Sequence, residues 1–298
     1  MERFKQKLLQ AGIPFRENEP LAAHCTFKIG GPAQLFVQPQ TEQQLCSAAA
    51  LCKEQAVRYY LLGNGSNILF ADEGFAGVVI DISALGSDIA VEGNMLTAGA
   101  GVRLAALCRA ALEHGLSGLE FAYGIPGTVG GAVYMNAGAY GGEMKDVLTV
   151  VRYLTAEGEV VQASAAELDL SYRHSIFEEN GGCILSAQFV LQPGNAADIR
   201  AKMDELMARR KASQPLEYPS AGSTFKRPEG YYAAALIDQC GLKGLTVGGA
   251  QVSEKHAGFV INRGSAACAD VTALMAEIQR RVKAQTGVEL EPEVRVIK

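Results

Sequence analysis

The sequence predicts a mixed protein of the α/β or α+β class with two domains. Segments with the alternating pattern of strands and segments with the 3.6-residue pattern of helices follow one another from end to end. The length of 298 residues exceeds the roughly 100–200 residues of a typical single domain. Glycine-rich stretches precede Pro193 and a regular helical pattern follows it, so we expect the domain boundary at residues 193–195.

Charge and composition exclude several classes of protein. The net charge is −5, whereas a nucleic-acid-binding surface is normally basic. No apolar run approaches the roughly 18 residues that span a bilayer, and residues 1–18 lack the apolar core of a signal peptide. The seven cysteines include no C-x-x-C pair and the four histidines no H-E-x-x-H pattern, so no metal is expected. We expect a cytoplasmic protein with reduced thiols, no membrane or nucleic-acid contact and no stable protein partner.

The first two thirds of the chain alternate helices and strands. Thr41, with Gln44 three residues later, has the capping-box pattern of a helix start, and Gly115 is a typical helix stop. The alternating segment 148–156, followed by a turn at 158–159, predicts a hairpin. Helices are expected at 2–11, 41–53 and 102–114, and strands at 33–38, 57–62, 78–82 and 183–191.

The last third is expected to hold three helices and two strands. Asp270 is expected to cap the last helix, and the alternating end of the chain is expected to be a strand over 288–298. On that strand Glu293 and Arg295 would share one face. The other expected elements are helices at 196–211 and 231–240 and a strand at 257–262.

A glycine-rich loop follows the strand expected at 57–62. It reads Gly63-Asn64-Gly65-Ser66-Asn67, and such turns can align successive N–H groups into a nest for an anion. It is not a Walker A loop, because no Gly-Lys-Ser/Thr follows. It is not a dinucleotide fingerprint either, because an isoleucine stands where the third glycine belongs. From the loop alone, phosphate binding and a simple tight turn both remain open.

A second glycine-rich stretch runs from Gly124 to Gly142. It holds seven glycines and almost no charge, so we expect neither a solvated linker nor an ordinary helix. Close approach of the backbone to a large, phosphate-bearing ligand explains it, with a buried crossover between sheets as the alternative. The two glycine-rich segments together favour a dinucleotide, and FAD rather than NAD because the Rossmann pattern is absent.

Three further motifs place polar side chains among small or aromatic residues. Arg173, within 172–177, either clamps an anion with its planar guanidinium or lies on the surface over an aromatic ring. Ser223 lies on a glycine-flanked turn with no histidine near it in sequence, which suits a hydrogen-bond or proton donor better than a nucleophile. Glu293 is either part of a site or half of a charge pair on an edge strand, which Pro292 favours.

These five motifs, in this order, resemble the UDP-N-acetylenolpyruvoylglucosamine reductase family (UDP-N-acetylmuramate dehydrogenases) of bacterial cell-wall synthesis. The similarity runs from about residue 24 to about residue 297. Its most specific parts are LGNGSNIL, IPGTVGGAVYMNAGAYG, YRHSIF, AGSTFKRP and GLKGLTVGGAQVSEKHAGFVIN. The direct run from Ser175 to Gly194 resembles the shorter subclass, which lacks a substrate-lid insert.

The resemblance implies an N-terminal helix and lead-in over 1–26. It implies an FAD-binding domain of the vanillyl-alcohol oxidase and p-cresol methylhydroxylase type over 27–193, and a C-terminal α+β substrate-binding domain over 194–298. The implied reaction is the reduction of UDP-N-acetylglucosamine enolpyruvate to UDP-N-acetylmuramate by NADPH through non-covalent FAD, in peptidoglycan precursor synthesis.

The resemblance also assigns roles to individual residues. Ser223 is implied as the proton donor, and Arg173 and Glu293 as groups that stabilise the developing enolate. Lys211, Lys226 and Arg227 are expected to bind the UDP phosphates, since a net-acidic protein needs a local cationic patch for them. The implied cofactor-binding residues are Gly63, Asn64, Gly65, Ser66, Asn67, Gly127, Thr128, Gly130, Gly131, Asn136 and Ala139.

Two other functions remain open from the residues alone. The glycine-rich segments also fit a related FAD-dependent oxidase or dehydrogenase with another substrate, although the C-terminal motifs argue against it. A non-enzymatic nucleotide-binding module would bind its ligand without redox turnover. Clustering of Arg173, Ser223 and Glu293 in one pocket would count against such a module.

Overall fold

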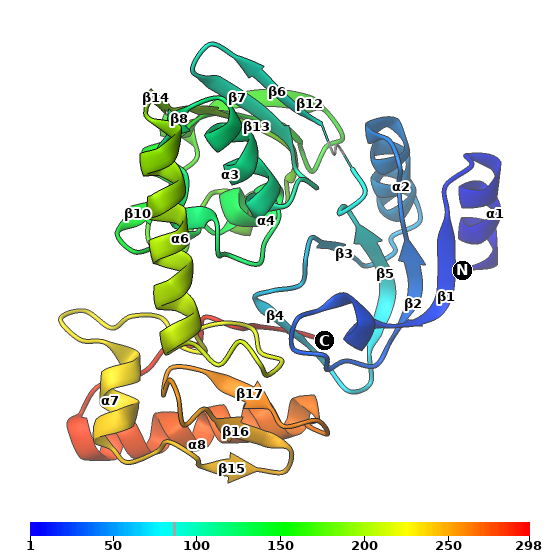
Figure 1. The fold of residues 1–298 in the computed structure, drawn as a ribbon. Coiled ribbons are helices and arrows are strands. Elements are labelled where there is room, and N and C mark those ends of the chain that lie inside the picture. Colours follow the sequence, from blue (N-terminus) through cyan, green and yellow to red (C-terminus); the bar gives the residue numbers. More distant parts are fainter. Residues whose placement is uncertain (86–87) are drawn as a thin grey trace. The chain divides into compact units, whose positions relative to one another are not determined.

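The computed structural model describes residues 1–85 and 88–298, and the chain divides into two compact units (Figure 1). The first unit comprises residues 1–17, 35–64 and 77–209, and the second comprises 18–34, 65–76 and 210–298. The chain thus contributes two early segments to the second unit, whereas the sequence suggested consecutive domains. The mixed helix and strand class is confirmed.

A four-stranded sheet in the order β1-β2-β5-β3 has most of its residues in the first unit. Strands β3 and β5 pair in parallel, with Tyr59 opposite Val78. The predicted start of helix α2 is confirmed, because the Thr41 side chain accepts the N–H of Gln44 at 3.2 Å. The elements are α1 (Glu2–Gln10), β1 (Phe15–Pro20), β2 (Pro32–Val37), α2 (Glu42–Glu54), β3 (Tyr59–Leu62) and β5 (Phe75–Asp81).

An antiparallel five-stranded sheet in the order β12-β11-β13-β7-β6 is the larger sheet of the first unit. The predicted hairpin is confirmed as β11 and β12, with Leu154 opposite Val160. The hairpin of β6 and β7 was not predicted from the sequence. The elements are β6 (Ile89–Glu92), β7 (Met95–Gly99), α3 (Leu104–Glu113), β11 (Leu148–Leu154), β12 (Val160–Ser164), β13 (Cys183–Val190) and α6 (Ala196–Ser213).

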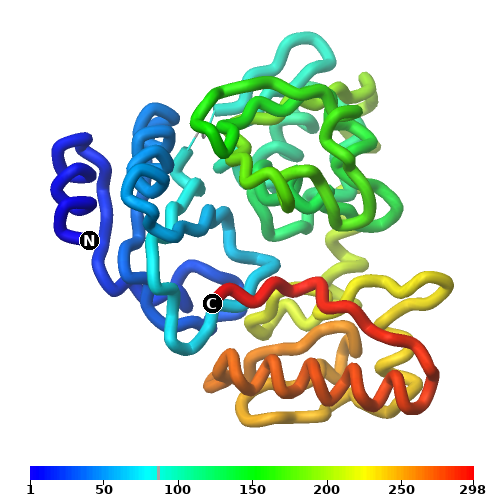
Figure 2. The backbone as a smooth tube through the Cα atoms, turned by 180° about the vertical axis from the view of Figure 1, so that it is seen from behind, coloured from blue at the N-terminus to red at the C-terminus, as the bar shows by residue number. Residues whose placement is uncertain are grey.

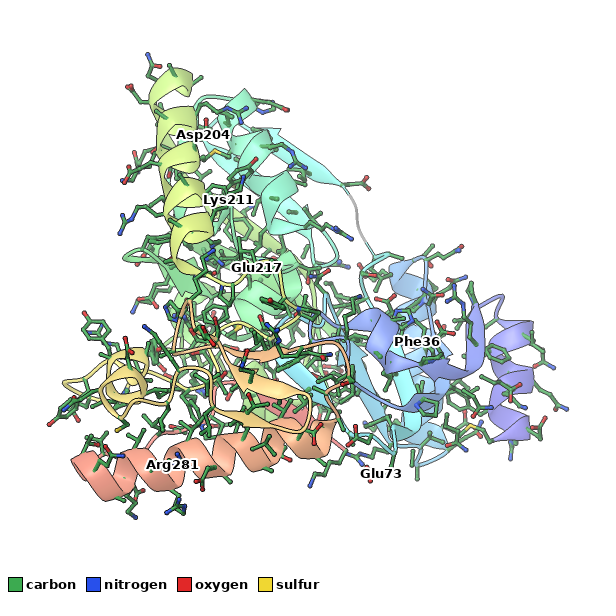
Figure 3. The ribbon with its side chains drawn as sticks, turned by 60° about the horizontal axis from the view of Figure 1, so that its bottom comes forward. Phe36, Glu73, Asp204, Lys211, Glu217 and Arg281 are labelled. Atoms are coloured by element: carbon green, nitrogen blue, oxygen red, sulfur yellow. The ribbon has the colours of Figure 1, made fainter. Side chains whose placement is uncertain are left out.

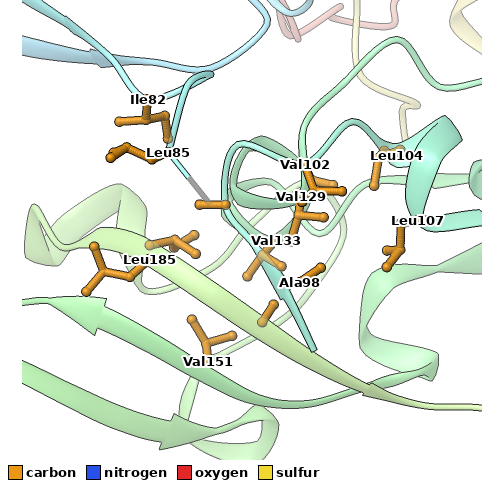
Figure 4. Packing of buried hydrophobic residues seen from close by; sticks show 14 of the residues in the cluster. Ile82, Leu85, Ala98, Val102, Leu104, Leu107, Val129, Val133, Val151 and Leu185 are labelled. Atoms are coloured by element: carbon orange, nitrogen blue, oxygen red, sulfur yellow. The ribbon is translucent and has the colours of Figure 1, made fainter. Parts of the chain in front are cut away.

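The second glycine-rich stretch is not an ordinary helix as a whole, but it contains one short helix, α4 (Val129–Tyr134), that the sequence did not predict. Thr128 caps this helix by accepting the N–H of Gly131 at 3.4 Å. Gly130 lets it pack closely, because a Cβ there would lie 2.9 Å from the Cβ of Ala100. Val129 and Val133 are fully buried in the core of the first unit (Figure 4). Tertiary packing therefore overrides the low helix propensity of glycine.

Short elements complete the first unit. Strands β9 and β10 form a tight hairpin, with Glu143 opposite Gly138, and β14 pairs with β8. These strands are β8 (Leu116–Ser117), β9 (Gly138–Ala139), β10 (Gly142–Glu143) and β14 (Gln192–Pro193). The short helices are η2 (Glu120–Ala122), η3 (Met144–Asp146), η4 (Ala165–Glu167) and α5 (Phe177–Asn180).

The second unit is built on the antiparallel sheet β15-β16-β17, which contacts helix α8. The C-terminal strand β18, the red end of the tube in Figure 2, pairs in parallel with β4. The expected strand over 288–298 is therefore shorter than predicted. The elements are η1 (Leu21–His24), β4 (Ile68–Phe70), α7 (Ala233–Gln239), β15 (Thr246–Val247), β16 (Ala250–Val252), β17 (Val260–Asn262), α8 (Cys268–Thr286) and β18 (Arg295–Ile297).

Helix α8 begins two residues before Asp270, so Asp270 caps the helix as expected, but from its third position and not as the N-cap. The Asp72 carboxylate accepts the N–H groups of Cys268 and Ala269 at 2.7 and 3.0 Å and takes the role of the N-cap. Asp270 instead accepts the N–H of Ala267 and that of Gly249, at 3.0 and 3.1 Å. In the described part of the chain, no helix is both long and apolar enough to cross a membrane.

Candidate active site

The loop at residues 63–67 leaves strand β3 and requires glycine at its centre. Gly65 has φ +61°, and a Cβ there would lie 2.3 Å from the carbonyl oxygen of His24. In the first unit the loop adjoins the second glycine-rich stretch. The Asn64 side chain donates to the carbonyl of Pro126 at 2.7 Å, and a Cβ on Gly63 would lie 2.8 Å from Thr128 Oγ1. Two segments about sixty residues apart in sequence thus form one surface.

The donors of this loop fit an anionic group. Within residues 1–85 and 88–298, none of the backbone N–H groups of 63–67 donates a hydrogen bond to a protein acceptor. Successive amide donors without a protein acceptor suit a pyrophosphate such as that of FAD. Asn64 and Asn67 direct their own amides to protein carbonyls. The backbone is therefore the part of the loop that fits the cofactor.

The remaining predicted cofactor residues lie in and around α4. The amides of Gly130 and Gly131 donate to Ala100 O and Thr128 Oγ1, and Gly127 accepts from the N–H of Leu104. Ala139 ends strand β9. These contacts set the path of the backbone.

Asn136 is fully buried, and its side chain is used within the first unit. It donates to Glu143 Oε2 at 2.7 Å and to Ser171 O at 2.9 Å, and it accepts the N–H of Lys145 at 2.9 Å. A cofactor contact by Asn136 would compete with these bonds.

Arg173 lies on a tight turn of the first unit. Ser171 and His174 exchange both backbone hydrogen bonds, and Arg173 between them has φ +58°. Its guanidinium donates to Gly138 O at 3.2 Å and lies 5.0 Å from the centre of the Tyr172 ring. Two residues after Arg173, Ser175 is fully buried and donates to Tyr134 O at 2.5 Å. Bonds on both sides thus fix the turn that presents the arginine.

Ser223 and Glu293 lie on neighbouring segments of the second unit. Thr224 donates its N–H to Gly258 O at 2.8 Å and accepts the N–H of Val260 on its buried hydroxyl at 2.9 Å. On the other side, Glu293 donates its N–H to Thr224 O at 2.9 Å. The structure thus brings the two segments together by direct backbone pairing.

The Ser223 hydroxyl has no hydrogen-bond partner within the described residues, and the side chain is half-buried. An alcohol with no internal acceptor keeps its proton available to a bound molecule. Arg173 belongs to the first unit and Ser223 to the second, so the clustering of all three predicted catalytic residues stays a prediction.

The three predicted phosphate-binding cations differ in their surroundings. Lys226 Nζ pairs with Glu291 Oε1 at 2.6 Å, and Arg227 lies 4.0 Å from the centre of the Tyr232 ring. Lys211 is exposed near the end of α6 (Figure 3). Lys226 is three residues from Ser223 on the same segment, and its N–H donates to Glu291 O at 2.8 Å. Glu291 therefore lies beside the segment that carries Ser223.

Burial determines the protonation of three cysteines and one histidine in this structure. Burial raises the pKa of Cys52, Cys108 and Cys183 to about 12, which keeps these thiols protonated. Burial lowers the pKa of His256, whose Nδ1 accepts the N–H of Gly258 at 3.2 Å. No group of three or more side chains suited to holding a metal occurs among residues 1–85 and 88–298.

Comparison with known proteins decides the family. Residues 214–297 match the family described as UDP-N-acetylenolpyruvoylglucosamine reductase, C-terminal domain, and residues 33–164 match an FAD binding domain. A UDP-N-acetylenolpyruvoylglucosamine reductase of Agathobacter rectalis is 51% identical, and the match covers 98% of this chain and 96% of that protein. The chain belongs to the UDP-N-acetylenolpyruvoylglucosamine reductase family.

Further relatives agree with this membership. The family's protein from Clostridioides difficile is 48% identical over 94% of this chain and 92% of its own length. The crystal structure of UDP-N-acetylenolpyruvylglucosamine reductase from Thermus caldophilus is 36% identical with a TM-score of 0.80, and the match covers 96% of this chain and 99% of that one. A Physcomitrella patens BBE-like 1 protein shares the fold alone, at 20% identity and a TM-score of 0.51 over 63% of this chain and 44% of that one.

Membership confirms the resemblance that the five motifs indicated. It makes the chain a flavoprotein oxidoreductase with FAD as its cofactor. The loop at 63–67 precedes the matched C-terminal domain and lies within the matched FAD binding domain, as predicted. Sequence reasoning did not find the role of Thr224, because its contacts join segments far apart in the chain.

Proposed function

We propose that this chain reduces UDP-N-acetylglucosamine enolpyruvate to UDP-N-acetylmuramate in peptidoglycan precursor synthesis, with NADPH as the reductant. The observation that carries the proposal is the pairing of the Ser223 and Glu293 segments in a member of this family. Bound FAD supplies the hydride chemistry, taking up reducing equivalents from NADPH and passing them to the substrate. The residues of the chain hold the reactants and handle the proton.

Ser223 is the proton donor. Addition of hydride to the methylene carbon of the enolpyruvyl group leaves enolate character at the neighbouring carbon, which must gain a proton. The Ser223 hydroxyl has no acceptor among the described residues, so it can turn to that carbon and then regain a proton from solvent. Proton transfer from a positioned group typically contributes about 10²–10⁴-fold in rate.

Arg173 and Glu293 stabilise the enolate as it forms. A guanidinium held on a fixed turn provides positive charge for the substrate carboxylate and the developing oxyanion. Preorganised groups of this kind typically contribute about 10²–10³-fold. Glu293 lies on the segment beside Ser223, where its side chain provides a hydrogen-bonding group for the enolate.

The loop 63–67 holds the FAD pyrophosphate on its backbone amides, and the stretch around Thr128, whose glycine amides donate within the protein, lines the site beside it. The side chains of Lys211, Lys226 and Arg227 hold the UDP phosphates, for which Lys226 must exchange its partner Glu291. By function, we assign an FAD part to residues 27–193 and a substrate part to residues 194–298, although the segments 18–34 and 65–76 pack in one unit with most of the latter. The seven free cysteines support a reducing, cytoplasmic location.

An absorption spectrum with anaerobic additions tests the function. We expect a flavin spectrum that NADPH bleaches and that UDP-N-acetylglucosamine enolpyruvate restores. Bleaching without restoration would keep the cofactor and reject the substrate, and fast oxidation by oxygen alone would favour an oxidase. Absence of flavin even after FAD is added would reject the interpretation of both glycine-rich segments.

Substitution of Ser223 tests the proton donor. Ser223→Ala is expected to leave the bleaching by NADPH nearly unchanged and to slow re-oxidation by the substrate by roughly 10²-fold or more. The exposed Ser265→Ala, in the same unit, serves as the matched control. Re-oxidation of Ser223→Ala at the control rate would remove Ser223 from this role.

A further inference from the structure

Two residues of the second unit, Thr26 and Asn67, join the loop at 65–67 to the segments that carry Ser223 and Glu293. Thr26 donates its N–H to Gly65 O at 3.0 Å, and its hydroxyl donates to Ser220 O at 2.6 Å. One residue thus holds both the centre of the loop and the start of the segment 220–226. Neither Gly65 nor Ser220 lies near Thr26 in sequence, since the separations are 39 and 194 residues.

Asn67 makes the corresponding connection to the other segment. Its side-chain amide donates to Glu293 O at 3.1 Å, and its own carbonyl accepts the N–H of Arg295 at 3.1 Å. The residue is therefore held to the C-terminal segment on both sides of Val294. Strands β4 and β18 continue this attachment directly afterwards.

These contacts close a ring of hydrogen bonds. The ring runs from the loop through Thr26 to Ser220, along the chain to Thr224, across to Glu293 and back through Asn67. Because each connection is a short bond to a backbone carbonyl or amide, a shift of the loop is transmitted to both segments. A misplacement of about 1 Å can cost about 10²-fold in a reaction that depends on orientation.

We propose that Thr26 and Asn67 are positioning residues, which fix the Ser223 and Glu293 segments against the loop at 65–67. The inference rests on the proposed function, since it assigns these two segments to the protonation of the substrate. Neither side chain needs to touch the reacting atoms. Removal of either should therefore affect the step that uses Ser223 more than the step that loads hydride from NADPH.

The Thr26 hydroxyl can be removed without a change of shape. In Thr26→Val, reduction by NADPH is expected to stay within about twofold of wild type, and re-oxidation by the enolpyruvyl substrate to slow by roughly tenfold or more. Thr26→Ser restores the hydroxyl and should restore re-oxidation to within a few-fold. Thr272→Val is the matched control, because among the described residues the Thr272 hydroxyl donates only to carbonyls of its own helix, Cys268 O and Ala269 O.

Hydrogen exchange gives a readout that does not depend on turnover. In the protein without FAD, Thr26→Val should speed amide exchange in the peptide 219–226, where Thr224 donates to Gly258 O, while the control leaves it unchanged. Asn67→Ala is the second variant, for which faster exchange is expected at 291–295 together with slower re-oxidation.

Three results would overturn the proposal. One is equal slowing of both half-reactions in Thr26→Val, which would indicate a merely structural role. Another is unchanged exchange in both variants, and the third is a failure of both variants to fold or bind FAD. If the proposed function itself is wrong, the enolpyruvyl substrate will not re-oxidise the wild-type protein either. This result distinguishes its failure from that of the positioning role.

Discussion

Gly65→Ala tests the geometry of the loop most directly, because two separate costs can be worked out from the structure. The residue has φ +61°, and left-handed backbone costs about 1–2 kcal/mol for a residue with a Cβ. The new Cβ would also lie 2.3 Å from His24 O and 2.8 Å from the Cα of Cys25. These are backbone atoms, so the chain must move, and overpacking of this kind typically costs about 1–3 kcal/mol.

Alanine also lowers the conformational entropy of the unfolded chain, which stabilises the folded state by about 0.4–1 kcal/mol and offsets part of this cost. The expected net loss for Gly65→Ala is therefore about 1–5 kcal/mol in the free energy of unfolding. Gly287→Ala is the matched control in the same unit, with φ +76° and nothing within 4 Å of its added Cβ. It should lose only about 0–1.6 kcal/mol, since no overpacking is added to the backbone cost.

Urea denaturation followed by circular dichroism measures both values, and titration of the flavin-free protein with FAD measures binding. Because the N–H of Thr26 donates to Gly65 O, a displaced loop also loses this bond, and we expect weaker FAD binding in Gly65→Ala only. Equal stability of the two variants, with wild-type FAD affinity in both, would refute the argument that close approach determines this residue.

Two further predictions concern thiols and pH. Burial raises the pKa of Cys52, Cys108 and Cys183 to about 12, which makes these thiols slow to react. Iodoacetamide at about pH 8 should therefore first modify the half-buried Cys240, as measured by peptide mass spectrometry. Early modification of Cys108 would contradict this prediction. Burial lowers the pKa of His256 below 6.5, so its contribution to stability is complete above that value and is lost as the pH falls through the lowered pKa. His256→Asn should therefore lose less stability than wild type between about pH 7 and about pH 5 in urea denaturation, and parallel curves would count against this cause.

The sequence by itself determined the features that depend on neighbouring residues. Thr41 and Gln44 mark the start of α2 because a cap acts across three residues, and the alternation from Leu148 predicts a strand because successive side chains face opposite sides of a sheet. The turn at 63–67 was predicted for the same reason, since glycine tolerates positive φ wherever it stands. The five motifs also sufficed to place the chain in its family.

Only the tertiary structure decided the contacts between distant segments. Asp72 caps α8 across 196 residues, and Asn67 reaches Glu293 across 226. No periodicity links such positions, because a hydrogen bond needs proximity in space and the local sequence cannot specify its partner. Helix α4 also depends on tertiary structure. Its glycines have low helix propensity, but the close packing of the core of the first unit around Gly130 leaves no room for a larger residue there.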